Sequence, residues 1–322
     1  MAVKWLLNDK FSESFNGSAL DFSIKEGKSY AFTDGEFDLT KSNHFYPSYI
    51  ANKVKECKDS KTVSRLDDDG NMVDSWVVGR NYYVKSHRKF FGIMEDKIKE
   101  IFPIEKIEDV EIKTSSAKGG RWGMREYIFP SIGIPVNTRE SESIINLRIA
   151  GWTALDGSTA NNFIIGAIDS FCSNGMIFTS SINKDDDIKQ LYKRNSKCFD
   201  LDLFSNTIMN WGKIFERRME EYQLMADTRL RKRDGYNFID SLGYSEKKVK
   251  GFDRLYHNEC EIRGENVFSL FSAFTNYSSH QNEDLFIVKK DINDTRALTM
   301  FKRQEEVTKI FESKKWKELV AA

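Results

Sequence analysis

The sequence contains little cysteine, and its cysteines are not spaced as metal or redox sites require. The four are Cys57, Cys172, Cys198 and Cys260, and the four histidines are scattered along the chain. No Cys-x-x-Cys pair and no Cys/His cluster with zinc-finger spacing is present. We therefore expect free thiols in a reducing environment, with no metal and no cofactor.

Catalytic motifs are also missing from the sequence. It has no Gly-x-Ser-x-Gly elbow, no phosphate-binding loop, no His-Glu-x-x-His zinc motif and no Gly-x-Gly-x-x-Gly fingerprint. A reactive cysteine needs a cationic neighbour or a helix N-terminus, whereas Cys172 is flanked by Phe171, Ser173 and Asn174. We expect Cys172 to be a buried thiol, and we expect no catalytic residue and no enzymatic activity.

Long apolar runs and an excess of charge of either sign are absent as well. No run approaches the eighteen apolar residues of a membrane span, and the start, MAVKWLLNDKF, does not resemble a signal peptide. Lys+Arg and Asp+Glu both number 49, so the whole chain has no net attraction to nucleic acid or membrane. We expect a cytoplasmic protein without a membrane contact, in which any site for a polyanion is a local patch.

Apolar and aromatic residues are plentiful, and their spacing changes along the chain. The alternation of Ile145, Leu147 and Ile149 with Asn146 and Arg148 is typical of a sheet with one covered face. We expect strands at 19–32, 123–130, 143–151, 161–169 and 176–180, a hairpin at 63–79, and helices at 91–102, 206–230, 239–259, 266–277 and 294–320.

Strands followed by helices predict an α+β fold rather than alternating βαβ units. We expect a central antiparallel sheet with hairpins, then a long helix and a helical C-terminal part. Residues 1–200 form the mixed sheet region in this prediction, and residues 201–322 form a mainly helical region packed on it. One continuous domain of 322 residues is the alternative.

A basic stretch without acids, KTSSAKGGRWGMR, runs from Lys113 to Arg125. Cations, glycines, hydroxyl groups and a tryptophan together suit a sugar-phosphate backbone with unstacked bases. We expect a nucleic-acid site at this hairpin, and we expect Arg125 and Arg148, if they lie on adjacent strands, to line the same sheet face as the loop. The alternative is a hairpin tip whose lysines are merely solvated.

Two further basic runs carry aromatic residues nearby, at 85–91 and at 229–233, and Lys247, Lys248 and Lys250 follow the second. Three such runs in a neutral protein favour nucleic-acid binding. We predict phosphate contacts by basic residues of the sheet hairpin and base stacking by its tryptophan. We predict outer electrostatic contacts from the run at 229–233. The predicted residues are Lys113, Lys118, Arg121, Trp122, Arg125, Arg148, Arg231, Lys232 and Arg233.

Two blocks resemble a known protein family. "TALDGSTANNFIIGAIDSFCSNGMIF" is similar to the DGS…CSN block of a phage- and plasmid-associated family of unknown function, and "FSLFSAFTNYSSH" resembles its C-terminal block. The second block has Ser272 where that family has asparagine, followed by Ala273, Phe274, Thr275, Tyr277 and His280. The resemblance covers roughly residues 60–290 and implies no settled activity.

The layout of basic hairpin, sheet and long helix is also similar to single-strand annealing proteins of the Red-beta and Rad type. That resemblance implies a cytoplasmic phage protein that binds single-stranded DNA as a homo-oligomer and acts in annealing or recombination. Two alternatives stay open: a non-enzymatic structural or host-interaction protein, and a nuclease that binds a metal through Asp67, Asp69 and Asp74.

Overall fold

The computed structural model describes residues 10–16, 18–43, 46–102, 108–170, 175–177, 209–280 and 295–321 of the chain. For residues 30–43, 46–55 and 175–177 only the course of the backbone is described.

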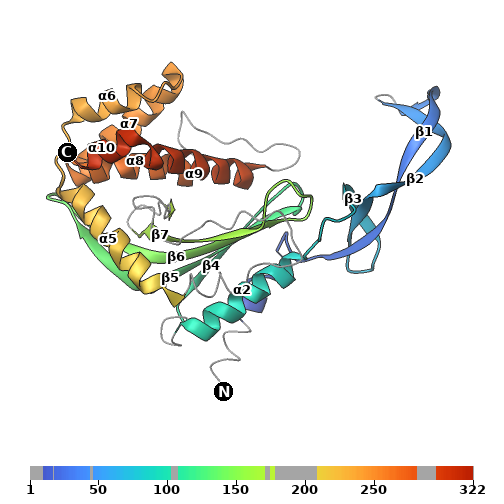
Figure 1. Cartoon of the computed structure of the whole chain (residues 1–322), viewed down its shortest axis with the longest axis horizontal. Helices are drawn as coiled ribbons and strands as arrows, with labels where there is room; N and C mark the ends of the chain where they lie inside the picture. The colour runs from blue at the N-terminus through green and yellow to red at the C-terminus, as the bar shows by residue number, and fades with distance from the viewer. Residues whose placement is uncertain are drawn as a thin grey trace.

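The body of the protein is built on a five-stranded antiparallel sheet (Figure 1). Its strands are β4 (Glu111–Ala117), β5 (Trp122–Asn137), β6 (Glu142–Ala154), β7 (Asn162–Asp169) and β8 (Gly175–Ile177). They lie in the sheet in chain order, so every connection joins neighbours. The predicted α+β class with a central antiparallel sheet is confirmed.

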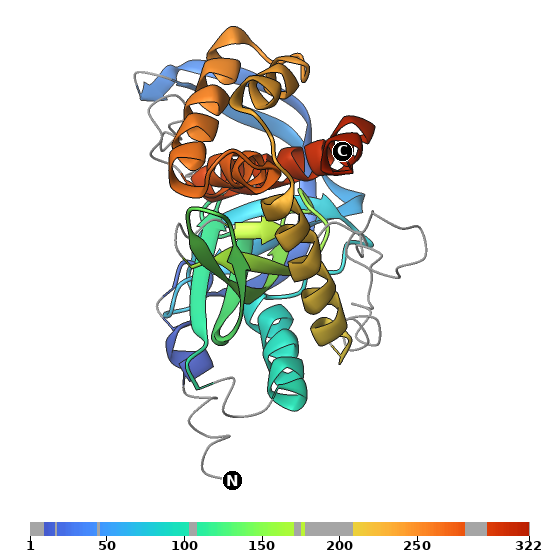
Figure 2. The same ribbon diagram turned by 90° about the vertical axis from the view of Figure 1, so that its left-hand side faces the viewer.

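Helices form layers on both sides of this sheet, as Figure 2 shows with the C-terminal helices above the green strands and α2 below. The helices are α2 (His87–Ile101), α5 (Trp211–Asp227), α6 (Lys232–Asp240), α7 (Glu246–Arg263), α8 (Val267–Ser279), α9 (Arg296–Glu312) and α10 (Lys314–Val320). Sheet and helical residues share one apolar core.

Neighbouring residues of β6 show that both sheet faces are covered. A Cβ atom at Gly151 would lie 2.2 Å from Sδ of Met94 on α2, whereas the ring of Trp152 lies 4.7 Å from that of Phe301 on α9. Successive strand residues point to opposite faces, so α2 covers one face and α9 the other. The expectation of a single covered face is therefore wrong, because Arg148 is also buried.

Helix α2 packs as its sequence predicts but begins at His87, four residues before the predicted range of 91–102. The Ser86 hydroxyl accepts from the Lys89 amide and caps the first turn. Phe90, Met94 and Ile98 follow at intervals of four residues and are fully buried, which places them on one stripe of the helix. This stripe fills the space beneath the sheet and fixes the position of the residues between its apolar members, such as Glu95.

A separate three-stranded sheet extends away from the body (Figure 1). Strands β1 (Ser23–Asn43) and β2 (Tyr46–Leu66) form a long hairpin, and β3 (Met72–Gly79) pairs with the part of β2 nearest the body. The predicted hairpin at 63–79 is confirmed. The strand expected at 19–32 overlaps the first part of β1, which begins at Ser23, and its extension into a ribbon was not predicted.

A small apolar core joins this second sheet to the body. Val63, Trp76 and Val78 pack with Val84 and Leu155. The Trp76 indole N–H donates to the Leu155 carbonyl at 2.9 Å. The base of the arm is therefore fixed to the loop after β6.

Candidate nucleic-acid interface

The turn between β4 and β5 contains two of the predicted glycines, and the chain itself covers Gly120, whereas Gly119 is exposed. Gly119 and Gly120 have φ angles of +63° and +87°, a region that favours glycine. A Cβ atom at Gly120 would lie 2.4 Å from the Ala19 carbonyl oxygen. His87 Nε2 is 2.6 Å from the Gly120 carbonyl oxygen. Gly120 therefore permits close internal packing, and the predicted approach of a ligand there has no open space.

Two basic residues of this turn are bound by carboxylates from distant parts of the chain. Lys118 Nζ lies 3.0 Å from Asp156, and Arg121 Nη2 lies 2.7 Å from Asp74. Burial alone would raise the pKa of Asp156, but hydrogen bonds from Ser158 and Lys118 outweigh it and lower that pKa. Both cations are half-buried and each is paired with a carboxylate, so they present little free positive charge.

Arg125 lies in the interior, beneath the sheet. Its side chain is 1% exposed and donates to Glu95 of α2 at 2.5 Å. The Tyr127 hydroxyl donates to the same carboxylate at 2.7 Å. Burial raises the pKa of Glu95, and the attraction of Arg125 opposes that rise. The predicted phosphate contact by Arg125 is corrected: the side chain is an internal cation that ties β5 to α2.

Arg148 is buried on the opposite face of the sheet. It is paired in register with Ile128, whereas Arg125 is paired with Gly151, and residues 125 and 128 of one strand point to opposite faces. Arg148 donates to Glu126 at 2.6 Å. The two arginines do lie on adjacent strands, but the predicted common face is wrong.

Trp122 and Lys113 complete the predicted hairpin site. Trp122 is fully buried, and its ring lies 5.6 Å from that of Phe301, so the predicted base stacking is corrected to core packing against α9. Lys113 is exposed on β4. In this conformation only Lys113 of the predicted hairpin residues is both exposed and free of an ion pair within the described part of the chain.

The basic run at 229–233 lies at the start of helix α6, far from the β4–β5 turn (Figure 1). Arg231 pairs with Asp234 three residues later, and its side chain is 72% exposed. Lys232 pairs with Glu261 of α7. Arg233 is exposed and forms no ion pair with any residue that the structure describes. The predicted sites on the sheet and on α6 thus do not form one continuous surface.

Helix α7 adds further cations beside α6. Lys247, Lys250 and Arg254 are all exposed, and their spacing of three and four residues places them on one side of the helix. The Tyr236 hydroxyl of α6 lies 3.5 Å from Nδ1 of the exposed His257. Sequence analysis noted Lys247 and Lys250 but missed Arg254, which continues the same helical spacing.

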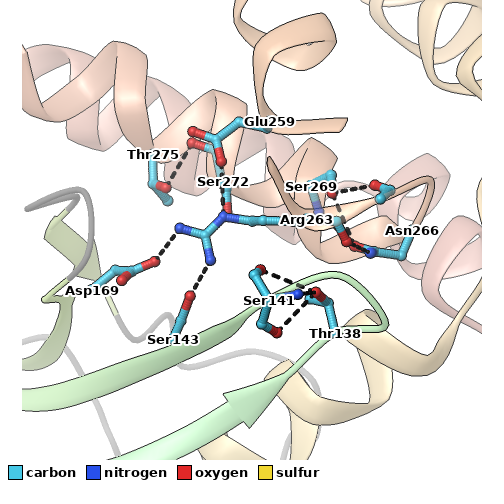
Figure 3. Close-up of polar contacts among 11 residues, drawn as sticks. Thr138, Ser141, Ser143, Asp169, Glu259, Arg263, Asn266, Ser269, Ser272 and Thr275 are labelled. Atoms are coloured by element: carbon cyan, nitrogen blue, oxygen red, sulfur yellow. Dashed lines mark hydrogen bonds and ion pairs between the residues drawn. The ribbon is translucent and has the colours of Figure 1, made fainter. Parts of the chain in front are cut away.

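A buried arginine network holds α7 on the sheet (Figure 3). Arg263 donates to Asp169 of β7 at 2.6 Å, to Glu259 one turn earlier at 2.8 Å, and to the hydroxyl of Ser143 on β6. Burial raises the pKa of Glu259, and Arg263 opposes that rise. Sequence reasoning missed this network; the only signal was Glu259 four residues before Arg263, which is common on helices.

Two of the three acidic residues proposed for a nuclease are used in other ways, and the third, Asp69, is exposed. Asp67 accepts from the Asn71 amide at 2.7 Å, and Asp74 binds Arg121. Among the residues that the structure describes, no group of three or more His, Cys, Asp and Glu side chains is placed to hold a metal. Cys172 lies outside the described residues, whereas burial raises the pKa of the Cys260 thiol to about 11.

Comparison with known proteins finds no matching family model, no matching curated protein and no matching solved structure. The resemblance of residues 153–178 and 268–280 to the phage-associated family stays a prediction. Within the described part of the chain, no helix is long and apolar enough to span a bilayer.

Proposed function

We propose that the chain is a non-enzymatic protein that binds single-stranded nucleic acid through the helical hairpin of α6 and α7. The observation that carries the proposal is local charge. Residues 229–257 contain eight Lys and Arg but four Asp and Glu, in a chain whose totals are equal. A cluster of cations on one element is the electrostatic signature of a polyanion site.

Two ion pairs on this surface leave their cations available, whereas Lys232 and Lys248 are more buried and pair with Glu261 and Glu306. Arg231 and Lys250 are 72% and 67% exposed, and they pair with acids three and four residues away. Exposed pairs of this kind contribute about 0–1 kcal/mol, so a phosphate can displace the carboxylate at little cost. The buried pairs of Arg125 and Arg148 lack this freedom.

Aromatic side chains among the cations favour single strands over duplex. Tyr236 and Tyr244 are half-buried beside exposed Arg233 and Lys247, and Lys248 lies 4.2 Å from the Tyr244 ring centre. Unpaired bases can stack on such rings, whereas bases inside a duplex cannot. A single strand following α6 and α7 would contact cations and rings alternately.

Fluorescence anisotropy with a labelled oligo(dT) strand tests the proposal. We expect binding that weakens steeply as salt is added, because phosphate contacts release counterions. Replacement of the exposed cations, Arg233→Glu, Lys247→Glu and Lys250→Glu together, should abolish most of this binding. If all three contact phosphates, the log–log salt slope should fall by about 2, since each contributes about 0.7 on a single strand.

The matched control reverses three exposed lysines elsewhere, Lys58→Glu, Lys89→Glu and Lys113→Glu, and should leave affinity nearly unchanged. The absence of binding at low salt would exclude the proposal. Equal loss in the control would exclude its location, because Lys113 belongs to the sheet hairpin. The finer assignment, a cytoplasmic phage-type annealing or recombination factor, rests on the sequence resemblance and needs a strand-annealing assay with complementary oligonucleotides.

A second candidate is a structural or host-interaction protein, and the extended β1–β2 ribbon favours it (Figure 1). Beyond Ser60 the ribbon has no third strand in register among the described residues. Isolated two-stranded ribbons are marginally stable in water, so contact with another protein would stabilise this one. Deleting the ribbon's outer part while preserving oligo(dT) binding would separate the two functions.

A further inference from the structure

A cavity of about 420 Å³ lies at the start of α6, at one end of the basic surface formed by α6 and α7. The β5–β6 turn, the end of α5 and the segment between α7 and α8 supply its other walls. Ligand pockets commonly measure about 300–1,000 Å³, so this cavity is large enough to take one nucleoside. Among its charged lining residues are Arg139, Glu140, Asp227, Arg229, Lys232 and Glu265.

Three side chains of this cavity have unused hydrogen-bonding groups. Arg139, Glu140 and Arg229 are exposed, and within the described part of the chain their side chains form no ion pair and no hydrogen bond. The other charged side chains are engaged: Lys232 pairs with Glu261, Asp227 accepts from Gln223, and Glu265 accepts from the Lys232 amide. The cavity therefore offers free guanidinium donors together with a free carboxylate acceptor.

The β5–β6 turn determines where two of these groups lie. The Thr138 amide and hydroxyl both donate to the Ser141 carbonyl, at 2.8 and 3.0 Å, and close the turn that carries Arg139 and Glu140 (Figure 3). A Cβ atom at Gly264 would collide with the Glu140 carboxylate. That carboxylate is thus placed between the turn and the end of α7, without being bonded to either.

The mixture of charges suits a base better than a phosphate. The lining contains three cations and four carboxylates, so a phosphate inside the cavity would gain no net attraction. Guanine presents two acceptors, N7 and O6, which the fork of an arginine can contact together, and it carries N–H donors on its Watson–Crick edge. Guanidinium planes also stack on unpaired bases. Of the four bases, guanine therefore matches free arginines and a free glutamate most closely.

We propose that this cavity takes one guanine base of a bound single strand. An arginine, Arg139 or Arg229, contacts the N7 and O6 edge, and Glu140 accepts from the N–H donors of the base. The phosphates stay outside, on Arg231 and Arg233, neither of which lines the cavity. This inference deepens the proposed function and rests on it, because the strand on either side of the guanine follows the cations of α6 and α7.

Fluorescence anisotropy with an oligo(dT) strand in which one central thymine is replaced by guanine tests the inference. We expect this strand to bind about tenfold more tightly than oligo(dT) itself, within the discrimination that one bidentate base contact provides. Replacement of the same thymine by adenine or cytosine should change affinity little. Equal affinities for all four strands, or an equal gain from adenine or cytosine, would overturn the assignment.

A variant in the turn locates the base. Glu140→Gln should remove most of the preference for guanine without weakening binding of oligo(dT), because the loss of a negative charge cannot reduce attraction to phosphates. Glu142→Gln is the matched control, since Glu142 is exposed at the start of β6 but does not line the cavity; it should keep the preference. If the preference survives in Glu140→Gln and in Arg139→Met with Arg229→Met, the guanine binds elsewhere and the inference is wrong.

Titration calorimetry with guanosine and thymidine separates this inference from the proposed function, because neither nucleoside carries a phosphate. We expect guanosine to bind to the wild-type protein but not to Glu140→Gln, and thymidine to bind to neither. Oligo(dT) binding without a preference for guanine would refute the cavity assignment and leave the proposed function intact. If oligo(dT) does not bind, the proposed function fails, and the absence of guanosine binding as well would rule out the cavity.

Discussion

The two basic regions of the chain look alike in sequence but differ in what surrounds their cations. In the β4–β5 hairpin and adjoining β6, the partners of Lys118, Arg121, Arg125 and Arg148 are carboxylates between 22 and 47 residues away. On α6 and α7, Lys232 and Lys248 also have distant partners, Glu261 and Glu306, but Arg231 and Lys250 have partners within four residues. The hairpin cations are therefore bound by distant carboxylates, whereas Arg231 and Lys250 remain exposed on the surface.

The difference shows that a basic run is not by itself a binding patch. A cation in a strand that becomes buried must acquire a carboxylate, since an unpaired buried charge is very costly. A cation on the exposed side of a helix has no such requirement. Free positive charge is therefore expected where cations follow a solvent-facing helix, even if a strand region has fewer acids in its sequence.

Breaking one buried pair should have the largest effect. Arg125→Met leaves Glu95 buried without its cation, and we expect the free energy of unfolding to fall by about 3–5 kcal/mol. Urea unfolding measures this loss. The paired variant Arg125→Met with Glu95→Gln should recover most of it, because the amide still accepts the Tyr127 hydroxyl.

The exposed pair of α6 provides the comparison. Arg231→Met removes the partner of Asp234, which is itself solvated, so we expect no measurable change in the unfolding midpoint. A loss as large as that in Arg125→Met would show that the α6 pairs are structural, and it would remove the distinction between the two regions.

Two histidines extend the comparison to pH. His87 is buried beneath the β4–β5 turn, and burial lowers its pKa from 6.5 to about 4, although the hydrogen bond to Gly120 opposes the shift. Between these values the unfolded chain binds a proton that the folded chain excludes. The contribution of His87 to stability should therefore fall as pH decreases from 6.5 to about 4, by roughly 3 kcal/mol in total, and stay constant below that.

Urea unfolding at a series of pH values measures this dependence. His87→Gln should lose the part that arises from His87, since glutamine does not titrate and can still donate to the Gly120 carbonyl. His257→Gln, at an exposed histidine on α7, should keep the wild-type profile. An unchanged profile in His87→Gln would show that His87 is accessible to protons.

Periodicity was sufficient to predict most of the body. The alternation around Ile145–Ile149 placed a strand inside β6, and the stripe at 266–277 placed α8 almost residue by residue. These signals are local, because each records which side of one element faces the core. The α+β class followed from the order in which the two periods occur.

The long ribbon and the fate of the basic residues could not be predicted in this way. The pairing of β1 with β2 depends on register over 21 residues of each strand, which no local period specifies. Arg125 was assigned to a surface because its partner Glu95 lies 30 residues earlier, on a helix whose position beneath the sheet was unknown. Strand parity could have shown that Arg125 and Arg148 face opposite sides, had their register been available.

The smallest expected effect comes from releasing the half-buried cations of the sheet hairpin. Asp74→Asn with Asp156→Asn removes the carboxylates that hold Arg121 and Lys118, and both cations are partly exposed already. We expect oligo(dT) affinity at low salt to rise about twofold to threefold, because pairs of this kind are worth only about 0–1 kcal/mol. Asp59→Asn with Asp109→Asn changes the net charge equally but frees no cation that is paired with them among the described residues. An equal rise in that control would mean that affinity follows net charge alone, whereas a much larger rise in the first variant would make the sheet hairpin a masked binding surface rather than a purely structural one.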